Sequence, residues 1–269
     1  MRHPTLAPSR RAVAAGLAWS TPFVAASLAA PAFATSPRCL VTTTATWNSA
    51  RYVRSSSTTG VYTFPDPDGT GPLQGMTLTV STSLGSNTRT GNQGPAVINN
   101  PPPTVNDNLR ARAGTTIGGA TSPLPLHQSP IDNSKKTDTL TDANKSVTTF
   151  TFTRQVTSLS FTITDIDSAS NDFWDAVAVE SPTAYTATKT SSTQVTGAGT
   201  VTNPWQAANN NLPVPDTSTA GNVKVTFSAP LTTFAIHYWN RTARSSSTID
   251  GDQGIFISNL QLTYNACPA

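Results

Sequence analysis

Apolar and polar residues alternate in several short stretches of this chain, most clearly within residues 146–164. Leu159, Phe161 and Ile163 are separated by single serine or threonine residues. A period of two residues is typical of a strand with one buried face and one solvent-facing side. The same period recurs in residues 76–81, 223–227 and 234–238. Because no stretch after residue 35 has a helical period, these patterns predict an all-β fold.

The number and spacing of the strands favour one architecture. About ten strands follow one another with short connections, which predicts a single antiparallel β-sandwich, of the jelly-roll type. Two immunoglobulin-like sandwiches are the alternative. Residues 85–145 interrupt the pattern with asparagine, proline, glycine and threonine. A loop of that length is either functional or contains strands that the pattern misses, and residues 109–113 are a candidate for one.

The first 34 residues have the features of an export signal. Arg10 and Arg11 precede an apolar run from residue 12 to residue 30, and Ala32-Phe33-Ala34 provides a cleavage site. We therefore expect a signal peptide over 1–34, recognised by the Sec or the twin-arginine route. The remaining residues, 35–269, form the predicted single domain of a secreted protein. No second apolar segment predicts a membrane span in that mature part.

The export signal changes the interpretation of the net charge. The chain has 17 Lys and Arg residues against 14 Asp and Glu residues, and three of the arginines lie within 1–34. The mature part is therefore close to neutral. This balance gives no support to a basic surface for nucleic acid.

The two cysteines lie at opposite ends of the predicted domain. Cys39 and Cys267 are the only cysteines in the chain, and an exported protein meets an oxidising environment. We predict a disulfide that joins the first strand to the last, with two free thiols as the alternative. Such a bridge also favours one domain over two.

Aspartates follow the clearest strand and form the first candidate site. Asp165 and Asp167 continue the alternation of the apolar residues before them, and a polar turn can bring Asp172 and Asp175 close. Several carboxylate oxygens at one end of a sandwich would suit a structural calcium ion. The alternative is that these aspartates cap turns by accepting backbone hydrogen bonds.

The second candidate site is a row of side chains on residues 232–241. His237, Trp239 and Arg241 alternate with Phe234, Ile236 and Tyr238, so the row would project from the outer face of the strand. An exposed indole beside hydrogen-bond donors can hold a sugar ring by stacking. The alternative is that the 85–145 segment covers Trp239 and makes it part of the core.

Catalytic patterns are scarce in this chain. Glu180 is the only glutamate, so a glycosidase would depend on aspartates alone. No Gly-x-Ser-x-Gly motif or histidine-cysteine zinc spacing is present. We therefore assign no catalytic residues and place a hydrolase last among the functional hypotheses.

Two segments carry a resemblance to a known class of proteins. Residues 156–167 read Val-Thr-Ser-Leu-Ser-Phe-Thr-Ile-Thr-Asp-Ile-Asp and residues 253–260 read Gln-Gly-Ile-Phe-Ile-Ser-Asn-Leu, with Asp-Ala-Val at 175–177 between them. Over residues 146–264 the chain resembles secreted bacterial surface proteins, often actinobacterial, with β-sandwich domains. It is also similar to jelly-roll carbohydrate-binding modules. That resemblance implies a structural calcium ion at one edge of the sandwich.

These observations lead to a ranked set of functions. The first is a secreted, non-catalytic module that binds an extracellular polysaccharide or cell-wall glycan through His237, Trp239 and Arg241. The second is a structural or adhesive protein that binds a cell-surface protein through a sheet face or edge. A hydrolase that uses the aspartates is the third.

Overall fold

The computed structural model describes residues 39–90, 95–97, 106–111, 113–132, 137–170, 172–241, 248–250 and 253–268. The predicted signal peptide, 1–34, lies outside these residues, so its cleavage and export route stay predictions. Among the described residues, no helix is both long enough and apolar enough to cross a membrane.

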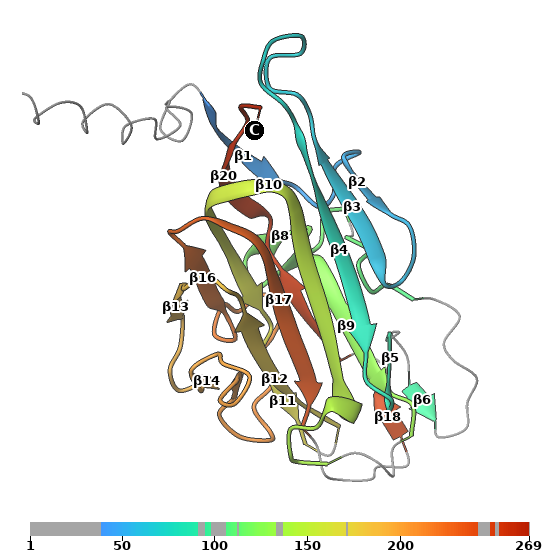
Figure 1. Ribbon diagram of the computed structural model, residues 1–269. Coiled ribbons are helices and arrows are strands. Elements are labelled where there is room, and N and C mark those ends of the chain that lie inside the picture. Colours follow the sequence, from blue (N-terminus) through green and yellow to red (C-terminus); the bar gives the residue numbers. More distant parts are fainter. Residues whose placement is uncertain are drawn as a thin grey trace, which may run out of the picture. The chain divides into compact units, whose positions relative to one another are not determined.

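The described residues form an all-β fold, which confirms the prediction from the alternating pattern (Figure 1). The strands lie in two layers that share β10 (Lys145–Thr164). The first layer has the order β2 (Tyr52–Arg54), β3 (Thr59–Phe64), β4 (Met76–Leu84), β10, β17 (Leu231–Asn240), β12 (Phe173–Glu180), β15 (Trp205–Ala207) and β14 (Val195–Thr196). The second contains β13 (Thr186–Lys189), β16 (Val223–Phe227), β10, β20 (Leu260–Asn265) and β1 (Leu40–Ala45), and β19 (Gly254–Ile257), β9 (Leu124–Pro130) and β5 (Thr88–Thr90) extend it.

Four short strands and one helical turn lie outside these two layers. They are β6 (Pro95–Val97) with β18 (Thr248–Asp250), β7 (Thr116–Ile117) with β8 (Ala120–Thr121), and the 3₁₀ turn η4 (Asp142–Asn144). β11 (Ser168–Ala169) pairs with the start of β12. All strand pairs among the described residues are antiparallel, as expected for short connections.

β10 holds the two layers together because it belongs to both. Its first half pairs with β4 and β17, and its second half pairs with β16 on one side and with β20 and β19 on the other. The register against β17 shifts between Thr151 and Val156, where the ribbon bends over from one layer to the next in Figure 1. Residues Arg38–Ala269 form one compact unit. The alternative of two separate immunoglobulin-like modules is therefore wrong.

The core lies between the two layers and follows the predicted register. Leu159, Phe161 and Ile163 are buried, as the alternation predicts. Phe234 on β17 stacks on Phe150 from the first half of β10, with ring centroids 4.6 Å apart, and on Phe161 from its second half, at 5.1 Å. Each buried phenylalanine contributes about 1.5–3 kcal/mol. The aromatic stack therefore stabilises the bend of β10 as well as the contact between layers.

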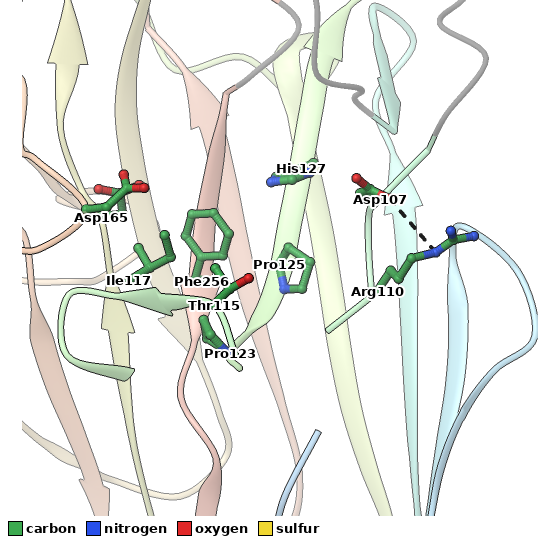
Figure 2. Close-up of a pocket in the computed structure, with 10 residues that line it drawn as sticks. Asp107, Arg110, Thr115, Ile117, Pro123, Pro125, His127, Asp165 and Phe256 are labelled. Carbon is green, nitrogen blue, oxygen red and sulfur yellow. Dashed lines mark ion pairs between the residues drawn. The ribbon is translucent and has the colours of Figure 1, made fainter. Parts of the chain in front are cut away.

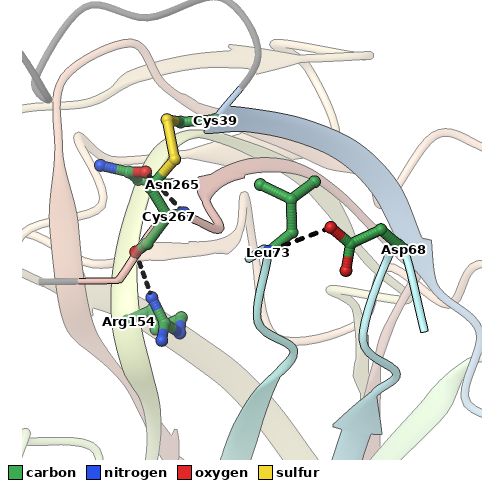
Figure 3. Close-up of a disulfide and its surroundings, with 6 residues drawn as sticks. All are labelled: Cys39, Asp68, Leu73, Arg154, Asn265 and Cys267. Carbon is green, nitrogen blue, oxygen red and sulfur yellow. Dashed lines mark hydrogen bonds between the residues drawn. A yellow bond between two sulfur atoms is a disulfide. The ribbon is translucent and has the colours of Figure 1, made fainter. Parts of the chain in front are cut away.

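The predicted disulfide between Cys39 and Cys267 is confirmed (Figure 3). Its two Cα atoms lie 5.0 Å apart, and 228 positions of sequence separate the residues. Arg154, at the bend of β10, donates a 2.8 Å hydrogen bond from Nη1 to the carbonyl oxygen of Cys267 and a 3.1 Å bond from Nε to that of Gly75. The bridge thus closes the first and last strands beside the point where β10 changes layer.

The 85–145 segment is more structured than the sequence analysis predicts. It contains β5, β6, β7, β8, β9 and η4 among its described residues, and β9 is buried along its whole length. A strand buried on both sides has no alternation of polar and apolar residues, so the period gives no signal for β9. The candidate strand at 109–113 is wrong, because Leu109 lies in a turn with a φ of 60° and donates its N–H to the carbonyl of Pro125.

Candidate functional site

The predicted row of His237, Trp239 and Arg241 does not form an open face. The row does lie on the opposite side of β17 from Phe234, Ile236 and Tyr238, but Trp239 is only 2% exposed and His237 only 6%. Leu140, just before η4, packs against the small cluster that Trp239 forms with two alanines of β12, Ala176 and Ala178. The expectation of an exposed row is therefore wrong, and the alternative is confirmed: Leu140, within the 85–145 segment, covers the indole of Trp239.

Most polar groups of this row contact other parts of the protein, whereas His237 Nδ1 is buried with no hydrogen-bond partner among the described residues. His237 Nε2 lies 2.8 Å from a carboxylate oxygen of Glu180, and its ring stacks on Trp239 with centroids 5.6 Å apart. The Arg241 guanidinium lies over the ring of Trp174 at 4.5 Å, and its Nε donates to the carbonyl of Asp138. These contacts hold the segment that contains Asp138 and Leu140 against β17. The row therefore has a structural role.

Replacing Trp239 by alanine should therefore reduce stability. The change leaves a cavity beneath Leu140, and truncation of a buried tryptophan costs about 3 kcal/mol. We expect urea denaturation of Trp239→Ala to show that loss, while binding of polysaccharide at a temperature where the variant is folded stays unchanged. Lost binding with unchanged stability would restore the original assignment.

The four predicted aspartates are only partly brought together. Asp165 has a φ of 70°, so the alternation of β10 ends there and its side chain leaves the register of Ile163. Asp167 and Asp175 contact each other through the backbone: the N–H of Asp167 donates to Asp175 Oδ2 at 3.2 Å, and the N–H of Asp175 donates to the carbonyl of Asp167 at 3.1 Å. Asp172 lies in the turn before β12.

Asp175 is the most deeply buried of these carboxyls. Its Oδ1 accepts hydrogen bonds from the Tyr238 hydroxyl at 2.8 Å and from Gln253 Nε2 at 2.9 Å. Asp167 Oδ2 accepts one from the N–H of Val214 at 2.8 Å. Backbone and side-chain donors therefore occupy several of the carboxylate oxygens that a calcium ion would need. This arrangement corresponds to the alternative in which the aspartates accept hydrogen bonds within the protein and cap turns.

Burial sets the electrostatics of this cluster. Desolvation raises the pKa of Asp175 well above its ordinary value, with the charge of Asp167 adding to the shift. Desolvation also raises the pKa of Asp165 to about 8 and that of Asp167 to about 6, and Asp216 contributes to both shifts. Within the described residues no group of three or more His, Cys, Asp or Glu side chains is placed to hold a metal ion. Calcium stays a prediction.

A pocket lies on the outer face of the second layer, beside Asp165 (Figure 2). Phe256 on β19 is paired with Thr164 of β10 on one side and with Pro125 of β9 on the other, so the three side chains share one face. His127 projects from β9 over Gly254, and its ring meets Phe256 edge to face at 5.6 Å. The pocket has a volume of about 360 Å³, and we name it the Phe256 pocket.

The β7–β8 hairpin forms one wall of this pocket. Gly118 and Gly119 make its two-residue turn with φ values of 56° and 79°, a conformation that favours glycine at both positions. The N–H of Gly118 donates to the carbonyl of Asp216 at 2.7 Å, and Asn222 Nδ2 donates to the carbonyl of Gly118 at 2.8 Å. These bonds attach the hairpin, and with it Ile117, to the loop that carries Asp216.

Charged side chains stand on both sides of the Phe256 pocket. Asp107 and Arg110 form an ion pair of 3.9 Å on one side, in which Asp107 is 3% exposed and Arg110 is 56% exposed. Asp165 lies on the other side in Figure 2. Asp216 also lines the pocket and interacts electrostatically with Asp165. An aromatic ring between carboxylates and a guanidinium can hold a polar ligand that has apolar faces.

The sequence analysis missed most of this pocket. Seven of its ten lining residues come from the 85–145 segment: Asp107, Arg110, Thr115, Ile117, Pro123, Pro125 and His127. A signal was present in Thr-Ile-Gly-Gly-Ala-Thr at 116–121, because two glycines between short β-formers are typical of a tight hairpin. Of the predicted site residues, only Asp165 lines the pocket.

The site has to be interpreted from its own geometry. It combines a half-buried aromatic ring, two carboxylates at one end and an ion pair at the other, on rigid strands of the second layer. Comparison with protein-family models, with curated proteins and with solved structures gives no match for this chain.

Proposed function

We propose that this protein is a secreted, non-catalytic module that binds an extracellular polysaccharide or cell-wall glycan in the Phe256 pocket. The observation that carries the proposal is the half-buried Phe256 ring in a pocket bordered by Asp107, Arg110, His127 and Asp165. Sugars present apolar C–H faces and hydroxyl edges, and this pocket offers a ring for the former and polar groups for the latter.

The dimensions and rigidity of the pocket support a short stretch of glycan as the ligand. A volume of about 360 Å³ is at the small end of the range for ligand sites, roughly 300–1,000 Å³. Phe256, Pro125 and His127 are held by paired strands. A preformed site loses little conformational entropy on binding. The pocket would therefore hold one or two sugar units while the rest of the polymer extends outward.

Replacing Phe256 by alanine should abolish this binding. The phenyl ring is only partly buried, so its loss removes the stacking surface with a moderate cost to stability. We expect Phe256→Ala to lose retention on insoluble polysaccharides by about tenfold or more, since an aromatic contact of about 1.4 kcal/mol or more corresponds to that factor. Depletion of the protein from solution by cellulose, chitin or peptidoglycan measures the effect.

The matched control is Phe173→Ala. Phe173 on β12 is also partly buried but does not line the Phe256 pocket. This variant should keep its retention. Equal loss in both variants, or no retention of the native chain on any polysaccharide, would contradict the proposed function.

Hydrolysis is the second candidate, and one observation favours it. Asp165, with a pKa raised to about 8, faces the Asp107–Arg110 pair across the pocket. Glycosidases use two carboxyl groups that face each other across the ligand, one of them with a raised pKa. Reducing ends released from the same polysaccharides, and lost in Asp165→Asn, would support catalysis over binding.

A further inference from the structure

We propose that a small cavity lined by Gln128 and Gln253, at the core side of β9 and β19, is a binding site for one buried water molecule. This water accepts a hydrogen bond from Gln128 Nε2 and donates one to Gln253 Oε1. The inference is independent of the proposed function, because the Phe256 pocket lies on the outer face of the same two strands.

The two glutamines lie side by side where the apolar core ends. Gln128 continues the inward register of Leu126 on β9. Gln253, just before β19, continues that of Ile255. The N–H of Gln128 donates to the carbonyl of Gln253 at 3.1 Å, so the two side chains are cross-strand neighbours on one face of the sheet. Each residue is only 1% exposed, so two amide side chains occupy positions that are apolar further along both strands.

Several amide atoms of these side chains are buried and unpaired. Gln128 Oε1, Gln128 Nε2 and Gln253 Oε1 have no hydrogen-bond partner within the described part of the chain. Gln253 Nε2 is already used, because it donates to Asp175 Oδ1 at 2.9 Å. Buried polar groups in proteins are nearly always hydrogen-bonded, and an unpaired buried amide destabilises the fold. A ligand that bonds these atoms removes that cost.

The cavity beside the two glutamines is polar and has the size of one water molecule. Its volume is about 10 Å³, close to the minimum that holds a single water. The rest of its lining is buried and consists of Asn87, Thr88, Ser129, Pro130, Asn144 and Asn240. The polar side chains among these have hydrogen-bond partners in the protein. Within the described residues, the unpaired buried side-chain atoms of the lining therefore belong to Gln128 and Gln253.

The unpaired atoms select a neutral ligand that both donates and accepts hydrogen bonds. Gln128 Nε2 needs an acceptor, and Gln253 Oε1 needs a donor. A metal cation would satisfy the carbonyl oxygens alone, and an anion would satisfy the N–H group alone. Water satisfies both and fits the volume. A water that bridges the glutamines stabilises, from the core side, the two strands that carry His127 and Phe256 on their outer face.

A high-resolution crystal structure of the native chain, grown without sodium or calcium salts, tests the inference. We expect one density peak at about 2.7–3.2 Å from both Gln128 Nε2 and Gln253 Oε1. No peak at that place, or glutamine amides that bond each other directly, would overturn the inference. A second crystal grown with sodium and calcium chloride should show the same peak at the same distances. Contacts of about 2.3–2.6 Å that appear only with these salts would assign the cavity to a cation and would also overturn it.

Gln128→Met provides the test in solution, because it removes the amide of Gln128 and puts a flexible apolar side chain in its place. Oxygen-17 relaxation dispersion, which counts long-lived waters inside a protein, should report about one water fewer in this variant. The matched control is Gln261→Met, which changes an exposed residue of β20 outside the cavity and should keep the native count. An unchanged count in Gln128→Met would contradict the inference. If that variant does not fold, the native crystal decides.

Discussion

The double variant Cys39→Ser/Cys267→Ser should melt about 10–20 °C below the native protein. The disulfide closes a loop of 228 positions, and the chain-entropy model gives about 5 kcal/mol for a loop of that length. For a domain of this size each kcal/mol corresponds to roughly 2–4 °C. Calorimetry or circular dichroism during heating measures the shift.

Reduction of the native protein provides the control for this experiment. Dithiothreitol should lower its melting temperature by the same amount and should leave the double variant unchanged. A melting temperature of the double variant within about 2 °C of the native value would show that pairing of β1 with β20 and of β20 with β10 suffices to hold the termini. The bridge would then have no stabilising role.

The second large effect is a loss of stability as the pH rises from about 4 to about 8. Burial raises the folded-state pKa of Asp165 to about 8 and that of Asp167 to about 6, whereas in the unfolded chain both ionise near pH 4. Between these values the folded state binds more protons than the unfolded state, so the free energy of unfolding falls with pH. Each carboxyl contributes about 1.4 kcal/mol for each pH unit of that interval.

Urea denaturation at a series of pH values measures this slope. Asp165→Asn should lose less stability than the native protein between pH 6 and pH 8, because only Asp165 among these two still titrates there. Asp138→Asn should follow the native curve. A free energy of unfolding that stays constant or rises over the interval would contradict the burial of these carboxyls.

The core and the disulfide could be predicted from the sequence because their signals are local. Leu159, Phe161 and Ile163 show their common face by spacing alone, and two cysteines allow only a single pairing. The alternation also predicted correctly that His237, Trp239 and Arg241 lie on the side of β17 opposite to the core. These features depend on neighbours within a few residues or on composition, and the structure agrees with them.

The site could not be predicted because it depends on contacts between distant segments. Trp239 is covered by Leu140, about 100 positions earlier in the chain, which no strand pattern indicates. The positive φ of Asp165 turns its carboxyl away from the register that the alternation implies. β9, which supplies Pro125 and His127, is buried throughout and lacks a period. Tertiary packing therefore determines the burial of Trp239, the direction of the Asp165 carboxyl and the burial of β9.

The central claim is that the hairpin segment and the outer face of β9 and β19 form the ligand site. Chemical-shift mapping of backbone amides during titration with a soluble fragment of a polysaccharide that retains the native protein tests it most directly. The account predicts that the largest shifts lie at Ile117, His127, Asp165 and Phe256, with small changes around Trp239. Shifts concentrated around His237, Trp239 and Arg241, or spread along the edge strands, would contradict it.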